Sequence, residues 1–166
     1  MENNQCASDK EIAISPYTST KTYGTVTGLS CAFRQWRADT SHCRFIHGYS
    51  LGFRFVFGCS DLDARGWVVN FGGLKNLKKL LEENFDHVLA VASDDPDKEL
   101  IVSLSAAGVA QVKVFEEGVG CERFAKKAFD LASTVLGSED SAINRWVISA
   151  ECFEHEGNSA IYTRQP

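Results

Sequence analysis

The clearest pattern in this chain is an alternation of large apolar residues with small or polar ones along residues 46–58. A period of two residues is typical of a β-strand that turns one face toward a core. The segment from Thr22 to Trp36, rich in Thr and Gly, is predicted to form a long, irregular strand antiparallel to it. Residues 38–44 are then the loop that joins the two strands.

Two later segments carry apolar residues at the spacings of three and four that mark an amphipathic helix. The first begins near Leu74 and closes at Phe85, and the second covers residues 122–136. The other predicted elements are a short helix and three strands, at 97–107, 112–115, 146–153 and 159–163. With two hairpins around two main helices, this order predicts an α+β fold. The helices would cover one face of a four-stranded antiparallel sheet.

Composition limits the class of protein. The chain has 166 residues, of which 44% are hydrophobic and 23% charged, which suits a single domain. We predict that domain at residues 17–166, after a polar, flexible N-terminal arm at residues 1–16. The net charge of −5 argues against a nucleic-acid surface. Lys75, Lys78 and Lys79 form a dense basic group, but acids surround them, and we expect them on a solvated helix face.

No apolar run approaches the roughly 20 residues that cross a bilayer, and the start of the chain does not resemble a signal peptide. We therefore expect a cytoplasmic protein without a membrane partner. Six cysteines are scattered along the chain without a Cys-x-x-Cys pair. In a cytoplasmic chain of this length they are expected to be free thiols.

A thiol, a carboxylate and two imidazoles stand out as candidate chemistry. Cys43 lies four residues before His47, and Asp86 and His87 follow some forty residues later. A thiolate needs a neighbouring base or cation to form near neutral pH, and an imidazole oriented by a carboxylate supplies one. The same residues have plainer interpretations. Cys43 can be a small buried apolar group, and Asp86 with His87 can be the polar end of a helix.

Five ordered motifs resemble the 6-pyruvoyltetrahydropterin and 6-carboxytetrahydropterin synthases, a family with the tunnelling fold. The resemblance spans about Phe33 to Tyr162. Its motifs are Cys43–Gly48 (Cys-x-x-x-His-Gly-His in the family), Gly66–Phe71, Phe85–His87 (Leu-Asp-His), Cys121–Ala125 (Thr-x-Glu-x-x-Ala), and Cys152–Glu154 with Tyr162 eight residues later. Each motif is short, but five in the correct order are hard to obtain by chance.

The resemblance implies a lyase that acts on 7,8-dihydroneopterin triphosphate, eliminates triphosphate with the help of zinc and rearranges the side chain. It implies that Cys43, Asp86 and His87 are catalytic and that Glu154 anchors the pterin ring. A carboxylate can accept two hydrogen bonds from the 2-amino group and ring N–H of a pterin. Cys43, activated by the Asp-His pair, would move protons on the side-chain carbons. The expected relative is the bacterial 6-carboxytetrahydropterin synthase, which feeds 7-deazapurine (queuosine) production.

The resemblance also implies a homotrimer or homohexamer, in which three four-stranded sheets close a barrel and sites form between subunits. Cys43 and His87 would then meet Glu154 across an interface. A Phe-rich sheet must bury its second face or keep it mostly polar. We expect subunit association to provide the cover.

The chain departs from the family at the zinc site. The family holds zinc with three histidines, one on the first strand and two in His-Gly-His. Here His47 is retained, Tyr49 replaces the second histidine of that motif, and the first-strand position falls on Trp36 or Arg37. A catalytic zinc normally takes three protein ligands and a water. We therefore expect the zinc site to be degenerate.

Three hypotheses remain open. In the first, the protein is a pterin-processing lyase in which Arg37 or His42 replaces the metal as the electrophile. In the second, it is a non-catalytic or repurposed oligomer that binds a pterin or purine-like ring through Glu154. The third, a cysteine hydrolase, would need an oxyanion hole, which no motif here supplies.

Overall fold

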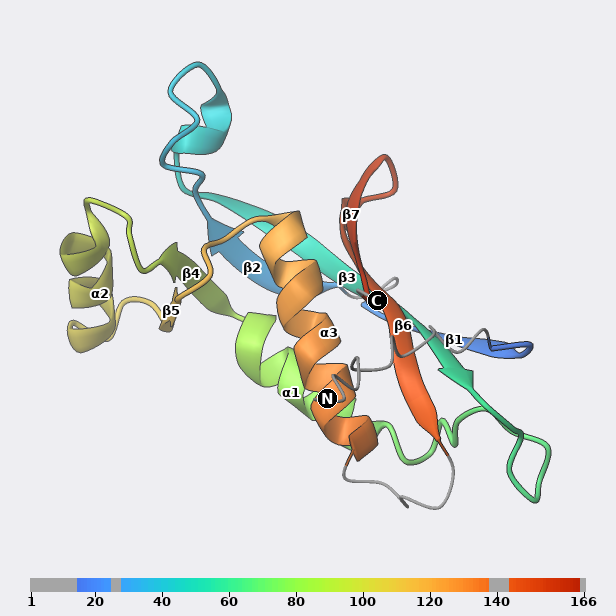
Figure 1. Cartoon of the computed structure of the whole chain (residues 1–166). Coiled ribbons are helices and arrows are strands. Elements are labelled where there is room, and N and C mark those ends of the chain that lie inside the picture. The colour runs from blue at the N-terminus through green and yellow to red at the C-terminus, as the bar shows by residue number, and fades with distance from the viewer. Residues whose placement is uncertain (1–14, 25–27, 138–143, 165–166) are drawn as a thin grey trace, which may run out of the picture.

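The computed structural model describes residues 15–24, 28–137 and 144–164, so most of the predicted N-terminal arm lies outside the described residues. In this part of the chain seven strands form one sheet in the order β5-β4-β2-β3-β6-β7, with β1 also paired to β3. The elements are β1 (Thr18–Tyr23), β2 (Leu29–Phe33), the 3-10 turn η1 (His42–Arg44), β3 (His47–Cys59), α1 (Lys75–Phe85), β4 (Val88–Ala92), α2 (Lys98–Ala106), β5 (Val112–Phe115), α3 (Cys121–Gly137), β6 (Arg145–His155) and β7 (Asn158–Thr163). Helices α1 and α3 lie together on one face of the sheet, and α2 lies beside β4 and β5 (Figure 1). The predicted α+β fold with two main helices is confirmed.

Strand β3 organises the sheet, as its alternating pattern predicts. Phe53, Phe55 and Phe57 are fully buried in the same core as Leu77 of α1 and Phe124 of α3. β1 and β2 pair with β3 in antiparallel fashion, and β6 pairs with it in the same sense. Because full burial of one phenylalanine side chain stabilises a fold by about 1.5–3 kcal/mol, this row of rings is a main source of stability.

The predicted continuous strand from Thr22 to Trp36 is wrong in its extent. β1 and β2 are separate strands that pair with successive halves of β3. The chain leaves β1 at Gly24, where φ is 78° and a Cβ would lie 2.7 Å from the carbonyl oxygen of Leu51. Glycine is the residue that permits both the positive φ and so close an approach of two backbones.

The predicted antiparallel sheet is too small. Strands β1, β3, β6 and β7 pair in antiparallel fashion, but among the described residues they belong to a larger, mixed sheet of seven strands. β4 is absent from the predicted elements, yet it pairs in parallel with both β2 and β5. Helix α2 forms the crossover between β4 and β5. Val88–Ala92 is a continuous apolar run, the usual pattern of a parallel strand covered on both faces. A search for alternation does not detect such a strand.

The face of the sheet turned away from α1 and α3 is mostly polar. One row across it contains Thr22, Arg54, Glu151 and Ile161, which are register partners from β1, β3, β6 and β7. Ser159 donates a hydrogen bond to Glu151 there. Because a polar sheet face tolerates water, subunit association is not required to bury it. The oligomeric barrel therefore stays a prediction.

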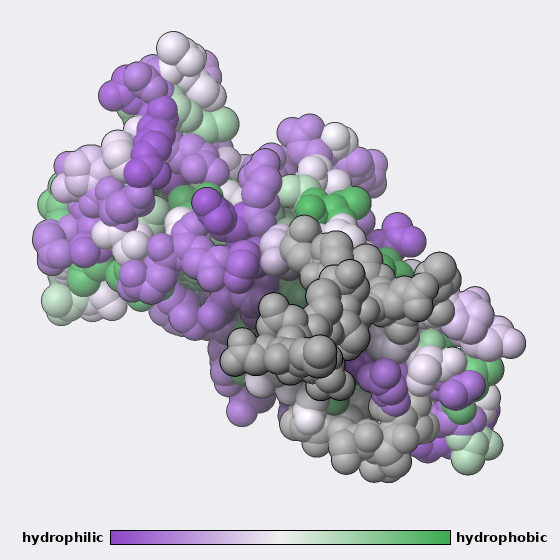
Figure 2. Space-filling view, viewed as in Figure 1, coloured by the Kyte–Doolittle hydropathy of each residue, from purple (hydrophilic) through white to green (hydrophobic). Residues whose placement is uncertain are grey.

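The outward surface of α3 is hydrophilic around its N-terminal half, as Figure 2 shows. On α1, Lys75 is exposed, and two ion pairs join Lys78 to Glu82 and Lys79 to Glu83 at a spacing of four residues. The prediction of a solvated basic face on this helix is confirmed.

Candidate active site

Phe33, His47 and Tyr49 form a cluster at one end of the β2–β3 ladder. Phe33 is the last residue of β2 and lies opposite His47, the first residue of β3. Tyr49 follows two residues later and therefore shares a face of the strand with His47. The rings of Phe33 and Tyr49 stack with 4.2 Å between centroids. The Tyr49 hydroxyl lies 2.5 Å from Nε2 of His47.

Hydrogen bonds occupy both ring nitrogens of His47. Its Nδ1 lies 2.7 Å from the carbonyl oxygen of Phe45. A carbonyl oxygen only accepts, so we assign the proton to Nδ1, which donates it. Nε2 then accepts the proton of the Tyr49 hydroxyl. The phenol oxygen keeps lone pairs for a further donor.

This cluster does not fit the three-histidine zinc site that the resemblance implies. The residue opposite His47 is Phe33, and the prediction of Trp36 or Arg37 at this position is wrong because β2 ends at Phe33. A phenyl ring offers no metal ligand, and the nitrogens of His47 are already engaged. Among the described residues, no group of three or more His, Cys, Asp or Glu side chains is arranged to hold a metal ion. One histidine and one neutral phenol fall short of the three ligands of a catalytic zinc.

The surroundings of Tyr49 connect two of the predicted site residues. Burial raises the pKa of Tyr49 to about 12, and the nearby charges of Glu154, Cys43 and Cys121 add to the rise. The phenol is therefore neutral near pH 7. Since electrostatic effects of this kind weaken with distance, Cys43 and Glu154 both lie in the neighbourhood of Tyr49.

Glu154 lies in a β-bulge of the β6–β7 hairpin. Phe153 pairs with Ser159 and His155 pairs with Asn158, which leaves Glu154 without a partner in the ladder. A bulge changes the direction of the extra side chain. Glu154 also lines a cavity of about 430 Å³ between β3 and the β6–β7 turn. This volume lies within the range of small-molecule sites.

Cys43 lies half-buried in the turn η1. Its backbone N–H donates to the hydroxyl of Ser41, and its carbonyl oxygen accepts from the backbone N–H of Gln35 at 2.7 Å. The Gln35 side chain donates to the carbonyl oxygen of Val119, just before α3. The turn η1, the N-terminus of α3 and the β6–β7 turn all lie at the same end of the molecule (Figure 1). The structure thus brings Cys43, Glu154 and the start of α3 to one end.

A buried ion pair fixes the chain just before the loop that carries Cys43. Arg34 donates to both carboxylate oxygens of Asp95, from Nε at 2.8 Å and from Nη2 at 2.5 Å, and Nη2 also contacts Asp97. The Asp95 side chain is 1% exposed. These hydrogen bonds hold the pKa of Asp95 below its usual value. The turn after β4 therefore anchors the end of β2.

Asp86 and His87 lie away from Cys43 within the same chain. Asp86 accepts a hydrogen bond from the backbone N–H of Ser30, near the start of β2, and lies 3.1 Å from Nδ1 of His87. Cys43 is bonded instead to Gln35, beyond the other end of β2. At about 3.3 Å per residue, the five steps along the chain from Ser30 to Gln35 span about 16 Å. The predicted thiol-imidazole pairing is therefore not formed within one subunit.

The two proposed replacements for the metal are engaged or exposed. Arg37 donates a hydrogen bond to Asp94 and stacks over the ring of Trp36 at 4.2 Å. Hydrogen bonds from Arg37 and from the Trp36 ring N–H lower the pKa of Asp94. His42 is exposed in η1.

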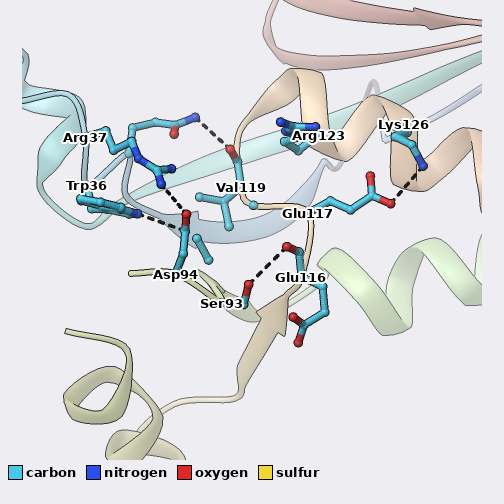
Figure 3. Close-up of a pocket in the computed structure, with 12 residues that line it drawn as sticks. Trp36, Arg37, Ser93, Asp94, Glu116, Glu117, Val119, Arg123 and Lys126 are labelled. Atoms are coloured by element: carbon cyan, nitrogen blue, oxygen red, sulfur yellow. Dashed lines mark hydrogen bonds and ion pairs between the residues drawn. The ribbon is translucent and has the colours of Figure 1, made fainter. Parts of the chain in front are cut away.

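A charged cavity of about 640 Å³ lies beside this loop (Figure 3). Asp94 pairs with Arg37 on one side, and Glu117 pairs with Lys126 on the other. Its walls come from segments around residues 35–37, 92–94 and 116–126, which are far apart in the sequence. No local sequence pattern therefore indicates this cavity.

The five cysteines in the described part of the chain are free, as predicted, and all except Cys43 are buried. Burial raises the pKa of Cys31 to about 12. A hydrogen bond with Cys121 and then burial raise the pKa of Cys152. Buried thiols with raised pKa values are poor nucleophiles, so Cys43 remains the best candidate among them.

Comparison with known proteins extends the motif evidence. Residues 25–165 match the sequence model of the family described as 6-pyruvoyl tetrahydropterin synthase. The 6-carboxy-5,6,7,8-tetrahydropterin synthases of Rickettsia conorii and Rickettsia typhi are each 38% identical over 56 residues, or 33% of this chain and 41% of each relative. The aligned stretch thus spans less than half of the curated relatives.

Solved structures show the same fold. An uncharacterized protein from Wolinella succinogenes superimposes with a TM-score of 0.74 at 18% identity, covering 90% of this chain and 98% of that one. The 6-pyruvoyl tetrahydropterin synthase of Plasmodium falciparum gives 0.61 at 12% identity, covering 91% and 99%. The Caenorhabditis elegans enzyme gives 0.58 at 17% identity, covering 90% and 96%.

Within the described residues, none of the helices has the length and apolar character to cross a bilayer. The expected family fold is confirmed by these structures, and the family match covers most of the chain. The chain therefore belongs to the 6-pyruvoyl tetrahydropterin synthase family.

Proposed function

We propose that this protein is a cytoplasmic pterin-processing lyase that acts on 7,8-dihydroneopterin triphosphate, eliminating triphosphate and rearranging the side chain. The observation that carries the proposal is that the half-buried thiol of Cys43 and the carboxylate of Glu154 both lie close enough to Tyr49 to act on its phenol. A thiol that moves protons and a carboxylate that orients the ring are the two parts that such a reaction needs.

Glu154 is the proposed anchor of the pterin ring. Residue 154 has no partner in the ladder, which changes the direction of its side chain. Glu154 acts electrostatically on Tyr49 and lines a cavity. A carboxylate that accepts two N–H groups side by side fits the 2-amino and ring N–H edge of a pterin. Cys43 is the proposed proton-transfer residue for the side-chain carbons.

We propose that Asp86 and His87 act on the Cys43 of a second subunit. Within one chain Asp86 is bonded to Ser30 and Cys43 to Gln35, positions separated by about 16 Å of extended chain. Asp86 nevertheless holds His87 by a 3.1 Å contact, and His87 is exposed. An exposed, oriented imidazole is available to a neighbour. A homotrimer or homohexamer would provide one.

The second candidate function is a non-catalytic or repurposed oligomer that binds a pterin or purine-like ring. The replacement of a metal ligand by Phe33 favours this alternative, because a binding protein needs no electrophile. The retained thiol, Cys43, favours the enzyme. For the enzyme, the expected product class is that of 6-carboxytetrahydropterin synthases, which supply 7-deazapurine formation.

The test is turnover of 7,8-dihydroneopterin triphosphate by the wild type and by the Cys43→Ala variant, with Cys59→Ala as a buried-thiol control. We expect release of triphosphate by the wild type and by Cys59→Ala, and a loss of about 10²-fold or more in Cys43→Ala. Tight pterin binding without turnover in the wild type would support the binding protein instead. Equal turnover by all three proteins would contradict the role of Cys43.

A further inference from the structure

We propose that Tyr49 and His47 take the place of the metal in this chain. In this inference, which rests on the proposed function, the Tyr49 hydroxyl binds a hydroxyl of the substrate side chain and relays its proton to His47. Tyr49 is then a catalytic residue, and the reaction proceeds without zinc.

The first argument is the occupancy of the site by aromatic residues. Phe33 fills the position opposite His47 and stacks on Tyr49, so the three positions form a packed unit. Phe33 is almost completely buried, and its ring also meets Phe124 of α3 edge-on. This packing holds the Tyr49 ring in one orientation, which is a requirement for a group that must meet a substrate atom.

The second argument is the direction of the hydrogen bonds. The Phe45 carbonyl oxygen, at 2.7 Å, fixes the proton of His47 on Nδ1, so that Nε2 accepts from the Tyr49 hydroxyl at 2.5 Å. A base oriented by a third group and bonded to a hydroxyl is the general arrangement of an activated hydroxyl. Here a backbone carbonyl is the orienting group.

The third argument is location. Tyr49 is near both Cys43 and Glu154. A pterin held by Glu154 and deprotonated at carbon by Cys43 would present its side chain to Tyr49. The other candidates for replacing the metal are worse placed, since Arg37 is paired with Asp94 and His42 is exposed in η1.

The proposed step transfers two protons, and no metal takes part in it. The O–H bond of a substrate hydroxyl breaks and its proton passes to the phenol oxygen of Tyr49, while the original phenol proton passes to Nε2 of His47. The electron pair of the broken O–H bond stays on the substrate oxygen, so the substrate leaves this step as an alkoxide whose negative charge balances the positive charge gained by His47. Tyr49 ends neutral, and His47 ends as an imidazolium whose Nδ1–H still donates to Phe45.

The experiment compares turnover by Tyr49→Phe and Tyr23→Phe after exhaustive chelation and dialysis of all proteins. Tyr23 is a matched control, because it is also half-buried, has a pKa raised to about 12 and donates a hydrogen bond, to the carbonyl oxygen of Leu74. We expect chelated wild type and Tyr23→Phe to retain activity. Tyr49→Phe should lose about 10²–10⁴-fold in kcat with little change in KM, since its ring still stacks on Phe33.

A second variant tests the positioning role of His47. The ring of His47 is exposed, so added imidazole can enter the space left in His47→Gly. We expect imidazole to restore turnover in His47→Gly and to leave Tyr49→Phe unchanged. Nitrogen NMR of the wild type should show His47 protonated on Nδ1, with an Nε2 signal that shifts in Tyr49→Phe.

The outcomes separate the two proposals. Loss of wild-type activity on chelation, with recovery on addition of zinc, would overturn the metal-free relay but leave the proposed lyase intact. Wild-type activity without any effect of Tyr49→Phe would do the same. A wild type that never turns over the triphosphate, whether or not zinc is added, would overturn the lyase, and the relay with it even if NMR finds the hydrogen bond.

Discussion

Phe33 lies directly opposite His47 in the β2–β3 ladder, and this pairing decides the chemistry of the site. In a ladder, opposite residues have Cβ atoms about 4.5–5.5 Å apart on the same face. Tyr49 joins them because it is two residues along from His47. A metal at this place would need side chains from these three positions, and one of them is a phenyl ring.

This relationship predicts that zinc binding can be created by two substitutions. Phe33→His with Tyr49→His would place three imidazoles on one face, and we expect about one zinc per subunit, held by three ligands and water. Mass spectrometry of metal content on untagged protein measures this. Phe33→His alone is the control and should stay nearly metal-free. Stoichiometric zinc in the unmodified protein would mean that another ligand set exists.

The shared-site proposal predicts complementation between inactive variants. Cys43→Ala and His87→Ala should each be inactive as pure proteins. If each site takes Cys43 from one subunit and His87 from another, random co-assembly at equal amounts leaves about one quarter of the sites with both residues. Unfolding and refolding the two variants together should recover turnover. Separate refolding followed by brief mixing is the control, and failure of co-refolded protein to recover activity would argue for sites within one chain.

The anchor proposal predicts a binding defect in Glu154→Gln. The amide would turn one of two acceptors into a donor that faces the N–H groups of the pterin. Since hydrogen bonds to charged groups contribute about 1.5–3 kcal/mol, we expect pterin affinity to fall about 10²-fold in calorimetry. Glu99→Gln, at an exposed position of α2 away from the cavity that Glu154 lines, should bind as the wild type does. Equal affinities of the two variants would remove Glu154 from the site.

The buried ion pair predicts how stability changes in acid. Hydrogen bonds from Arg34 depress the folded-state pKa of Asp95 below that of the unfolded chain. Its contribution is therefore fully present above the ordinary aspartate pKa of about 4 and is lost as the pH falls through the lower folded-state value. Asp95→Asn should lower the free energy of unfolding by about 2 kcal/mol near pH 7, the value expected for hydrogen bonds to a charged group.

Urea denaturation between about pH 2 and pH 7, the range that includes the titration of aspartates, measures the free energy of unfolding of each variant. The gap between Asp95→Asn and wild type should narrow as the pH falls below about 4. Asp97→Asn removes the other, half-exposed partner of Arg34 and should cost at most about 1 kcal/mol. A gap for Asp95→Asn that stays constant with pH would contradict the linkage.

Local patterns predicted most of the elements that build the core. The alternation around Phe53 and Phe55 predicted β3, and leucine spacing predicted α1. Their signals were strong because each element buries one face and exposes the other. β4 was not predicted, because both of its faces are covered and its sequence therefore lacks the alternation of apolar and polar residues. The break between β1 and β2 was not predicted, because it depends on the close approach of Gly24 to the backbone of Leu51.

The residues of the candidate site were predicted in part, because some of them belong to short motifs and others are brought together only by strand pairing. Ordered motifs identified Cys43, Asp86 and Glu154 as residues to examine, and the structure places Cys43 and Glu154 around Tyr49. The motif spacing misplaced the first-strand position, although Leu29 and Phe33 follow the alternation that continues into the core. Extending that alternation to the end of β2 would have identified Phe33.

The sequence by itself determined the α+β class, the amphipathic helices, the family motifs and the loss of two histidines, because each depends on residues close together in the chain. Only the tertiary structure decided that Phe33 faces His47, that Tyr49 donates to that imidazole, and that His87 is remote from Cys43 within one subunit. These relations depend on strand register and on which end of a strand each loop leaves. A register shift of one residue turns every side chain of a strand to the opposite face of the sheet. The spacing of residues along the chain therefore does not determine which side chains meet.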